Sequence, residues 1–300
     1  MVKLENLNVA VIGLGLLGGS LALALRGRVK TVFTWARRDE TRDFARRHGM
    51  GDVVCETSRE ALSHADVAVL CLPIPAIVDF LKNHADEFAP GSVATDIGSV
   101  KRVIVSAGEA GLAARGVSFV GSHPMAGTEK SGADAAFAEL YDHAEVFVTP
   151  TPESDPAAVE TVTALWEALG TRVNPISPGS HDVLVAHTSH ISHLLALGIT
   201  LSVLGEKNPE LRRLRFSGCA TGFRDTSRIA SSSPAMWRQI VEANSDAIML
   251  AIAEYEWKFA EIKRLIAVGD FDGFEKLFAE GKALRDSWIE YKNREQNCNW

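Results

Sequence analysis

The stretch Asn8-Val-Ala-Val-Ile-Gly-Leu-Gly-Leu-Leu-Gly18, near the start of the chain, decides the fold. Its five leading residues predict a buried strand, and the Gly-x-Gly-x-x-Gly pattern after them predicts a tight turn into a helix. In such a turn the first glycine permits the bend, the second lets a pyrophosphate approach the backbone, and the third lets the helix pack closely on the strand. The pattern predicts a dinucleotide site in preference to a purely structural glycine loop. The residues expected to contact the cofactor there are Gly13, Gly15, Leu16, Leu17 and Gly18.

The end of the second predicted strand indicates which dinucleotide binds. An NAD site has Asp or Glu about 20 residues beyond the glycines, where it accepts hydrogen bonds from the ribose. Ala36 stands at that position here, and Arg37 and Arg38 follow it. Since arginine can pair with a 2′-phosphate, NADP is favoured, and NAD stays possible. In the alternative, both arginines are solvated loop charges, and Asp39 serves as the acid, although Asp39 looks better placed to cap the next helix.

Up to about residue 178, short apolar runs alternate with helical stretches at 18–26, 40–48 and 156–169. This alternation is typical of the α/β class and predicts a Rossmann-type, doubly wound parallel sheet in a dinucleotide-binding domain, residues 1–178. The predicted strands are 8–12, 31–35, 67–72, 92–96, 118–120, 145–149 and 172–176.

Helical patterns dominate residues 179–300, which we expect to form an all-helical domain for substrate binding and dimerisation. Ser180 is a candidate N-cap for a helix that runs to about residue 204. A later helix has apolar residues at alternating spacings of four and three, and Gly269 is placed to end it. Another helix starts near Gly273. Packing within one chain explains part of this pattern, but the wide apolar faces favour a homodimer. The apolar seam consists of Ile248, Ile252, Tyr255, Phe259, Ile262 and Ile266.

Composition excludes several classes of protein. The chain has 300 residues, of which 46% are hydrophobic and 23% charged, as in soluble globular proteins. A net charge of −7 without a long basic stripe argues against nucleic-acid binding. The uncharged stretch 9–25 is broken by glycines and has no basic leader, so we expect neither secretion nor a membrane span. Four scattered cysteines favour reduced thiols in the cytoplasm.

Two polar segments carry the candidate chemistry. His123 lies in Gly121-Ser-His-Pro-Met-Ala-Gly127, a glycine-flanked loop that follows a predicted strand at the edge of the sheet where ligands bind. A neutral imidazole there can accept a proton from an alcohol as hydride leaves. Ser99 ends another strand at the same edge, and its hydroxyl can orient the imidazole or contact the nicotinamide. Farther along, Arg224 and Arg228 offer guanidinium groups for an anionic substrate.

With these motifs, the chain resembles the prephenate/arogenate dehydrogenase family of tyrosine biosynthesis over nearly its whole length. The resemblance implies oxidative decarboxylation of a cyclohexadienol carboxylate, prephenate or arogenate. Since no chorismate mutase segment precedes the first predicted strand and no room for a regulatory domain follows the predicted helices, we expect any feedback control to act through the catalytic body. The matching segments are 13–20, 96–101, 121–132, 189–194, 222–230 and 234–238.

The family's functional residues carry over onto matching positions. His123 matches the base that takes the hydroxyl proton, Ser99 its partner near the nicotinamide, and Arg228 the clamp on the ring carboxylate. Ser192 departs from the family pattern, which has proline there, and Ala36 departs from the acid of NAD enzymes. The remaining matches, His193, Glu129, Arg224, Asp225 and Trp237, are implied to line the substrate pocket.

Several alternatives stay open. His187, His190 and His193 recur every third residue, but no zinc-type glutamate accompanies them, so we expect no metal. Arg228 can pair with Asp225 as a structural bridge. The chain can also be a β-hydroxyacid dehydrogenase, although no catalytic lysine is convincingly placed, or a non-catalytic dimer that senses nicotinamide nucleotides.

Overall fold

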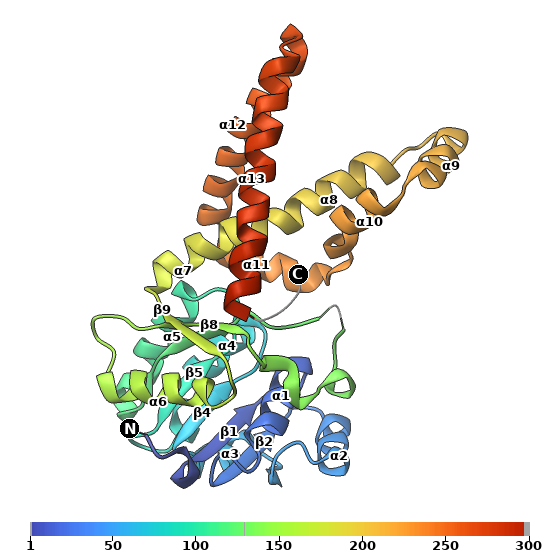
Figure 1. The fold of residues 1–300 in the computed structure, drawn as a ribbon. Helices are drawn as coiled ribbons and strands as arrows, with labels where there is room; N and C mark the ends of the chain where they lie inside the picture. Colours follow the sequence, from blue (N-terminus) through green and yellow to red (C-terminus); the bar gives the residue numbers. More distant parts are fainter. Residues whose placement is uncertain (1, 129, 297–300) are drawn as a thin grey trace. The chain divides into compact units, whose positions relative to one another are not determined.

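The computed structural model describes residues 2–128 and 130–296, and the chain divides into two compact units, Met1–Ala247 and Ile248–Trp300. The first unit is built on a six-stranded parallel sheet with the strand order β3-β2-β1-β4-β5-β6 (Figure 1). This is the order of a Rossmann fold, so the predicted fold class is confirmed. The strands are β1 (Asn8–Ile12), β2 (Thr31–Trp35), β3 (Val53–Val54), β4 (Val67–Leu70), β5 (Val93–Asp96) and β6 (Ser118–Phe119).

Two hydrophobic cores lie on opposite faces of this sheet because alternate residues of each strand point to opposite sides. Val9 and Val11 of β1 join one core, whereas Ala10 and Ile12 join the other, and all four are fully buried. Strands buried on both faces explain the nearly continuous apolar runs in the sequence. The connecting helices are α1 (Leu16–Leu25), α2 (Asp39–His48), α3 (Ser58–Ser63), α4 (Ile74–Asn83) and α5 (Arg102–Leu112).

A second, three-stranded sheet carries three segments that the sequence analysis placed elsewhere. It consists of β7 (Gly121–Pro124), β8 (Glu145–Thr149) and β9 (Arg172–Pro175), with α6 (Pro156–Glu167) between the last two. The β7–β8 pair is antiparallel, so 145–149 and 172–176 do not extend the parallel sheet. His123, predicted to lie in a loop, lies on β7. This strand was not predicted because β7 is buried on both faces and its sequence shows no alternation of polar and apolar residues.

The first unit also contains most of the helical region. Its helices are α7 (Pro178–Val185), a π-helical segment (Ala186–His190), α8 (Ile191–Leu204), α9 (Pro209–Gly218), α10 (Thr221–Ser227) and α11 (Pro234–Ala243). Ser177, not Ser180, is the N-cap of α7, because Pro178 occupies the first helical turn and Ser177 Oγ accepts a hydrogen bond from Ser180 N. By length and hydropathy alone, Pro178–Leu204 is also a candidate membrane span, although two buried polar residues, His181 and Asp182, lie within it.

Short 3-10 turns complete the described elements. They are Leu4–Asn6, Ala85–Glu87, Ala113–Arg115, Ala133–Ala135, Ala138–Tyr141 and Arg228–Ser231.

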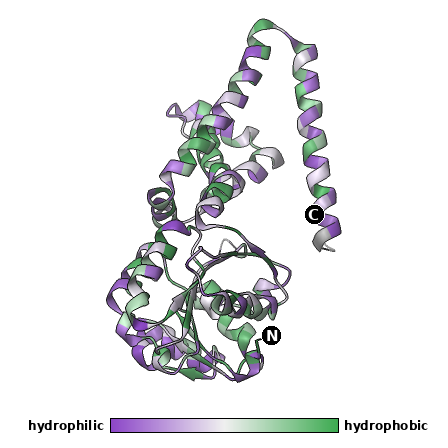
Figure 2. Ribbon diagram, turned by 90° about the vertical axis from the view of Figure 1, so that its left-hand side faces the viewer, coloured by the Kyte–Doolittle hydropathy of each residue, from purple (hydrophilic) through white to green (hydrophobic). Residues whose placement is uncertain are grey.

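The second unit consists of two long helices, α12 (Ser245–Val268), which begins in the first unit, and α13 (Phe271–Gln296). Gly269 between them has φ +71°, and its amide and that of Asp270 bond back to Ile266 O and Leu265 O, so the predicted helix end is confirmed. Hydrophobic residues recur along both helices, as the hydropathy colouring of the ribbon shows (Figure 2). Many remain exposed, among them Trp257 at 66% and Phe278 at 70%. An apolar surface of this kind is typical of an interaction face.

Candidate active site

His123 is held on a rigid strand at the junction of the two sheets. Val120 N donates to Ala94 O in the first sheet, and the chain then continues directly into β7 of the second sheet. The neighbouring Ser122 is locked in place, since its hydroxyl donates to Asp96 O at 2.6 Å and accepts from Trp166 Nε1 at 2.9 Å. His123 itself is only 9% exposed, so its imidazole has little freedom.

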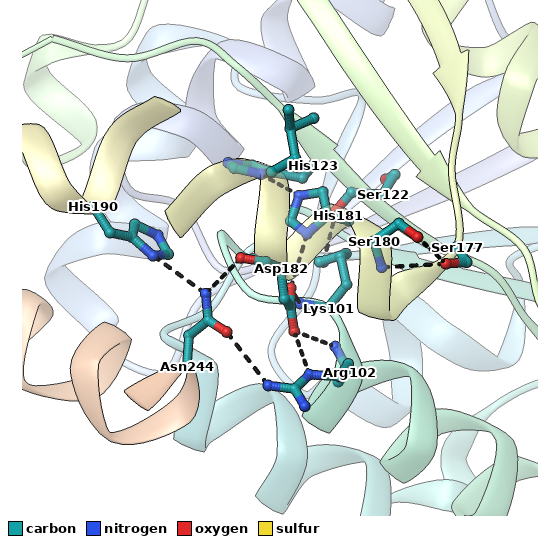
Figure 3. A network of polar contacts seen from close by, with 12 residues as sticks. Lys101, Arg102, Ser122, His123, Ser177, Ser180, His181, Asp182, His190 and Asn244 are labelled. Carbon is teal, nitrogen blue, oxygen red and sulfur yellow. Dashed lines mark hydrogen bonds and ion pairs between the residues drawn. The ribbon is translucent and has the colours of Figure 1, made fainter. Parts of the chain in front are cut away.

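The imidazole of His123 forms the first member of a buried polar row (Figure 3). His123 Nδ1 lies 2.8 Å from His181 Nε2, and His181 Nδ1 lies 2.8 Å from Asp182 Oδ1. His181 and Asp182 are consecutive residues in the second turn of α7, and both are fully buried. We call these three residues the His–His–Asp row.

The carboxylate of Asp182 is anchored at the start of α5. Lys101 N donates to Oδ1 at 2.7 Å, Arg102 N donates to Oδ2 at 3.0 Å, and the Arg102 side chain also contacts Oδ2 at 3.3 Å. An anion at this position also interacts favourably with the positive end of the helix dipole. The row is therefore attached to both the sheet and the helical region.

Burial and hydrogen bonding hold the row in a defined charge state. Burial lowers the pKa of His123 well below 6.5, and nearby His181 and Lys101 lower it further. Burial also lowers the pKa of His181, against the opposing effect of Asp182. Burial alone would raise the pKa of Asp182, but hydrogen bonds from His181 and from two backbone amides outweigh it and lower that pKa. Both imidazoles are thus neutral and the carboxylate is ionised near neutral pH.

A buried ion pair lies beneath this row. Lys101 Nζ contacts Asp96 Oδ2 and also donates to Ser122 O at 2.8 Å. The carboxylate of Asp96 accepts two further bonds, from Gly98 N at 2.7 Å and from Ser122 N at 3.3 Å. Both side chains are fully buried, and burial raises the pKa of Asp96 and lowers that of Lys101, each against its partner's charge. This pair ties β5, β7 and the start of α5 together.

The π-helical segment brings two predicted pocket residues near the row. Asn244 Nδ2 donates to Asp182 O at 2.8 Å and lies 3.3 Å from His190 Nδ1. His190 meets Trp237 edge-on, and His193 lies against the same indole with ring centroids 4.3 Å apart. Burial lowers the pKa of His190 to about 4. The structure therefore connects His193 and Trp237 to the His123 neighbourhood through His190.

The ring nitrogens of this cluster differ in their hydrogen-bond partners. His193 Nδ1 donates to Ser189 O at 3.0 Å, which leaves Nε2 as an acceptor. The buried Trp237 Nε1 has no hydrogen-bond partner in the described structure. His187 bonds instead to Val183 O, so the three evenly spaced histidines have different partners. Residues 2–128 and 130–296 contain no group of three or more possible metal ligands.

The remaining predicted substrate residues are not joined to this cluster in the structure. Arg224 pairs with Asp225 at 3.1 Å, and both side chains are largely exposed on α10. Arg228 is exposed at the end of α10, and among described residues it forms no ion pair, so the alternative bridge to Asp225 is not made. No hydrogen bond of the Ser99 hydroxyl is found in the described structure, and Glu129 lies outside the described residues. Their roles stay predictions.

The glycine turn between β1 and α1 forms a cradle in which the first and third glycines leave no room for a side chain. A Cβ on Gly13 would lie 2.4 Å from Cys71 O, and a Cβ on Gly18 would lie 1.9 Å from Gly13 O. A Cβ on Gly15, by contrast, would meet nothing within 4 Å, so space is open above that backbone. Gly15 is the N-cap of α1, where the first amides have no intrahelical partner. Such a site suits a pyrophosphate.

At the end of β2, one arginine is structural and two are exposed. Arg42 donates to Ala36 O at 2.8 Å and pairs with Asp39 at 2.7 Å, so the carboxylate of Asp39 is occupied. Asp39 is the first residue of α2, and Arg38, not Asp39, is its N-cap residue. Arg37 and Arg38 are exposed, and within the described part of the chain neither forms an ion pair.

Sequence reasoning missed the residues that support His123. His181 and Asp182 follow a Ser-Pro helix start by a few residues, and that proximity to a helix N-terminus was the available signal. Asp96 and Lys101 lie in a segment already singled out, but only the structure shows that both are buried. Asn244 follows α11 and gave no signal of its own.

Comparisons with known proteins extend over nearly the whole chain. The family "Prephenate dehydrogenase, nucleotide-binding domain" matches residues 20–175, and "Prephenate dehydrogenase, dimerization domain" matches residues 177–280. Cyclohexadienyl dehydrogenase of Zymomonas mobilis is 32% identical over 281 residues, which cover 93% of this chain and 94% of that protein.

Solved structures give the same result. Prephenate dehydrogenase from A. aeolicus, in complex with hydroxyphenyl propionate and NAD+, is 31% identical with a TM-score of 0.86 and covers 93% of this chain and 97% of its own. Arogenate dehydrogenase from Synechocystis is 28% identical with a TM-score of 0.83 and covers 94% of this chain and 100% of its own.

Proposed function

Because the chain belongs to the prephenate dehydrogenase family, we propose that His123 is the general base for oxidation of prephenate or arogenate. The chain is an NAD(P)-dependent dehydrogenase of tyrosine biosynthesis. This membership decides against a β-hydroxyacid dehydrogenase. We infer three further properties: the role of each side chain, the preferred substrate and the preferred cofactor.

One observation carries the proposal: His123 is a buried imidazole whose Nδ1 is already bonded, which leaves Nε2 for the substrate. The low pKa of His123 keeps Nε2 unprotonated at neutral pH, so this atom can accept the proton of the substrate hydroxyl. A nicotinamide whose pyrophosphate is held at the glycine turn would supply the acceptor for the hydride. Loss of carbon dioxide then makes the ring aromatic, and the rigid strand keeps Nε2 in place throughout.

The cofactor fits the glycine cradle of the first unit. Gly15 and the amides of Leu16 and Leu17 would hold the pyrophosphate at the start of α1. We infer a preference for NADP, because Arg37 and Arg38 are exposed and unpaired within the described residues, whereas Asp39 is bound to Arg42. NAD is the alternative cofactor, since the structure of the A. aeolicus relative contains NAD+.

We infer that the substrate binds between His123 and the residues His193 and Trp237 of the helical region. His193 Nε2 can accept, and Trp237 Nε1 can donate, a hydrogen bond to a polar group of the substrate. We assign Arg228 to the ring carboxylate because a planar guanidinium can bind a carboxylate through two hydrogen bonds. The Arg228 guanidinium forms no ion pair with any described residue.

A homodimer accounts for the exposed apolar helices of the matched dimerization domain. A cytoplasmic location is consistent with Cys55, Cys71 and Cys219 being free thiols.

The test is a turnover assay with prephenate and arogenate, each offered with NADP+ and with NAD+. We expect a reduced cofactor and carbon dioxide in equal amounts with at least one substrate, and faster reduction of NADP+ at low cofactor concentration. No reduction in any of the four combinations, despite measurable nucleotide binding, would leave a non-catalytic nucleotide-binding dimer as the better explanation.

A further inference from the structure

His181 and Asp182 have no role predicted from the sequence, yet His181 contacts the base His123 and Asp182 contacts His181. His181 is completely enclosed, with its ring edge-on to the rings of His123 and Phe147. A buried pair of histidines is unusual, because burying polar rings is costly unless each buried nitrogen has a suitable partner. The protonation of each nitrogen can therefore be deduced in order, starting from Asp182.

The carboxylate of Asp182 can only accept hydrogen bonds while it is ionised. Two backbone amides and the Arg102 guanidinium donate to it, and this arrangement stabilises the charged form. His181 Nδ1, 2.8 Å from Asp182 Oδ1, must therefore carry a hydrogen. Since a neutral imidazole carries only one, His181 Nε2 is a bare acceptor.

The same reasoning fixes His123. Its Nδ1 lies 2.8 Å from the bare Nε2 of His181, and a hydrogen bond there requires the hydrogen on His123 Nδ1. The hydrogen of neutral His123 is then on Nδ1, and Nε2 is left with its lone pair. That is the tautomer a proton-accepting base needs.

We propose that His181 and Asp182 are positioning residues that select the Nδ1–H tautomer of His123 and support the imidazolium formed when His123 Nε2 takes the substrate proton. This inference rests on the proposed function of His123. During the reaction the proton moves from the substrate oxygen to Nε2, Nδ1–H stays bonded to His181, and the Asp182 carboxylate balances the new positive charge. No other proton needs to move.

The experiment combines nuclear magnetic resonance with kinetics. Ring nitrogen shifts of uniformly ¹⁵N-labelled, ligand-free protein distinguish protonated from bare nitrogens, and the signals of His123 are identified by their loss in His123→Gln. We expect protonated Nδ1 and bare Nε2. A bare Nδ1 and protonated Nε2 in the wild type would overturn the proposal, and this measurement needs neither substrate nor a variant of His181.

Two variants of His181 separate hydrogen bonding from packing. His181→Leu fills the space without an acceptor, so the buried Nδ1–H loses its partner; we expect mixed tautomers and a kcat lower by about 10- to 100-fold, with KM nearly unchanged. His181→Gln keeps a carbonyl oxygen and should retain the Nδ1–H tautomer, with a kcat at least about tenfold above that of the Leu variant. His48→Leu, the same change at an exposed position on α2, should match the wild type.

The outcomes separate the two hypotheses. Equal kcat values for the Leu and Gln variants, at equal melting temperatures, would overturn the role of His181 as an acceptor. If the wild type reduces no cofactor with either substrate, the proposed function fails, whereas the ring nitrogen shifts still decide the tautomer. If His181→Leu does not fold, the wild-type and Gln spectra decide.

Discussion

Replacing Lys101 with Met should destabilise the protein strongly, because it leaves Asp96 buried without its positive partner. Both side chains are fully buried, and the substitution also removes the donor to Ser122 O. The carboxylate would keep only the amides of Gly98 and Ser122. Removing one partner of a buried ion pair typically lowers the free energy of unfolding by about 3–5 kcal/mol. That loss corresponds to a factor of roughly 10² to 10⁴ in the unfolding equilibrium.

Urea unfolding followed by circular dichroism measures this loss, with the free energy extrapolated to water. The double variant Asp96→Asn/Lys101→Met removes both charges and should recover a substantial part of the stability, because no unpaired charge remains. Arg59→Met, which breaks the exposed pair with Asp86, is the matched control and should leave the urea midpoint unchanged. A loss below about 1 kcal/mol in Lys101→Met would refute the reasoning that this carboxylate is charged and isolated from water.

Three further predictions concern the site. Because burial holds the pKa of His123 in the ligand-free protein well below 6.5, kcat/KM should be level down to pH 6.5 and decrease only at lower pH as the imidazole is protonated; an acid limb of kcat/KM assigned to His123 and centred at or above pH 6.5 would contradict this assignment. The double variant Arg37→Ala/Arg38→Ala should raise the Kd for NADP by about tenfold and leave that for NAD nearly unchanged in a fluorescence titration, whereas equal losses would remove both arginines from the phosphate site. Arg228→Ala should raise KM, by an amount corresponding to about 2–3 kcal/mol, in steady-state kinetics, and an unchanged KM would exclude it from the substrate site.

The first sheet could be predicted from the sequence because local signals and long-range packing agree there. Over residues 8–25 an apolar strand, a glycine turn and a helix follow one another, and each has its own local sequence signal. The strands β1 and β2 have the predicted bounds. Residues 121–124 could not be assigned in this way. Their strand character comes from pairing with β8, which lies more than 20 residues farther along the chain.

The candidate site was only partly predictable for a similar reason. His123 could be selected because its segment resembles that of a known family, but its partner lies 58 residues away and on another element. The contact between His123 and His181 depends on how α7 packs against β7 and β8, which no local pattern encodes. Lys101 is the strongest example, because lysine is almost never fully buried and the sequence alone favours a solvated side chain.

The turnover of His123→Ala tests the central claim most directly. At saturating substrate and cofactor, removal of the base should lower kcat by about 10²-fold or more, while the variant stays folded and its nucleotide affinity stays close to that of the wild type. A variant that keeps near-normal turnover would show that another group takes the hydroxyl proton, and the account of this site would be wrong.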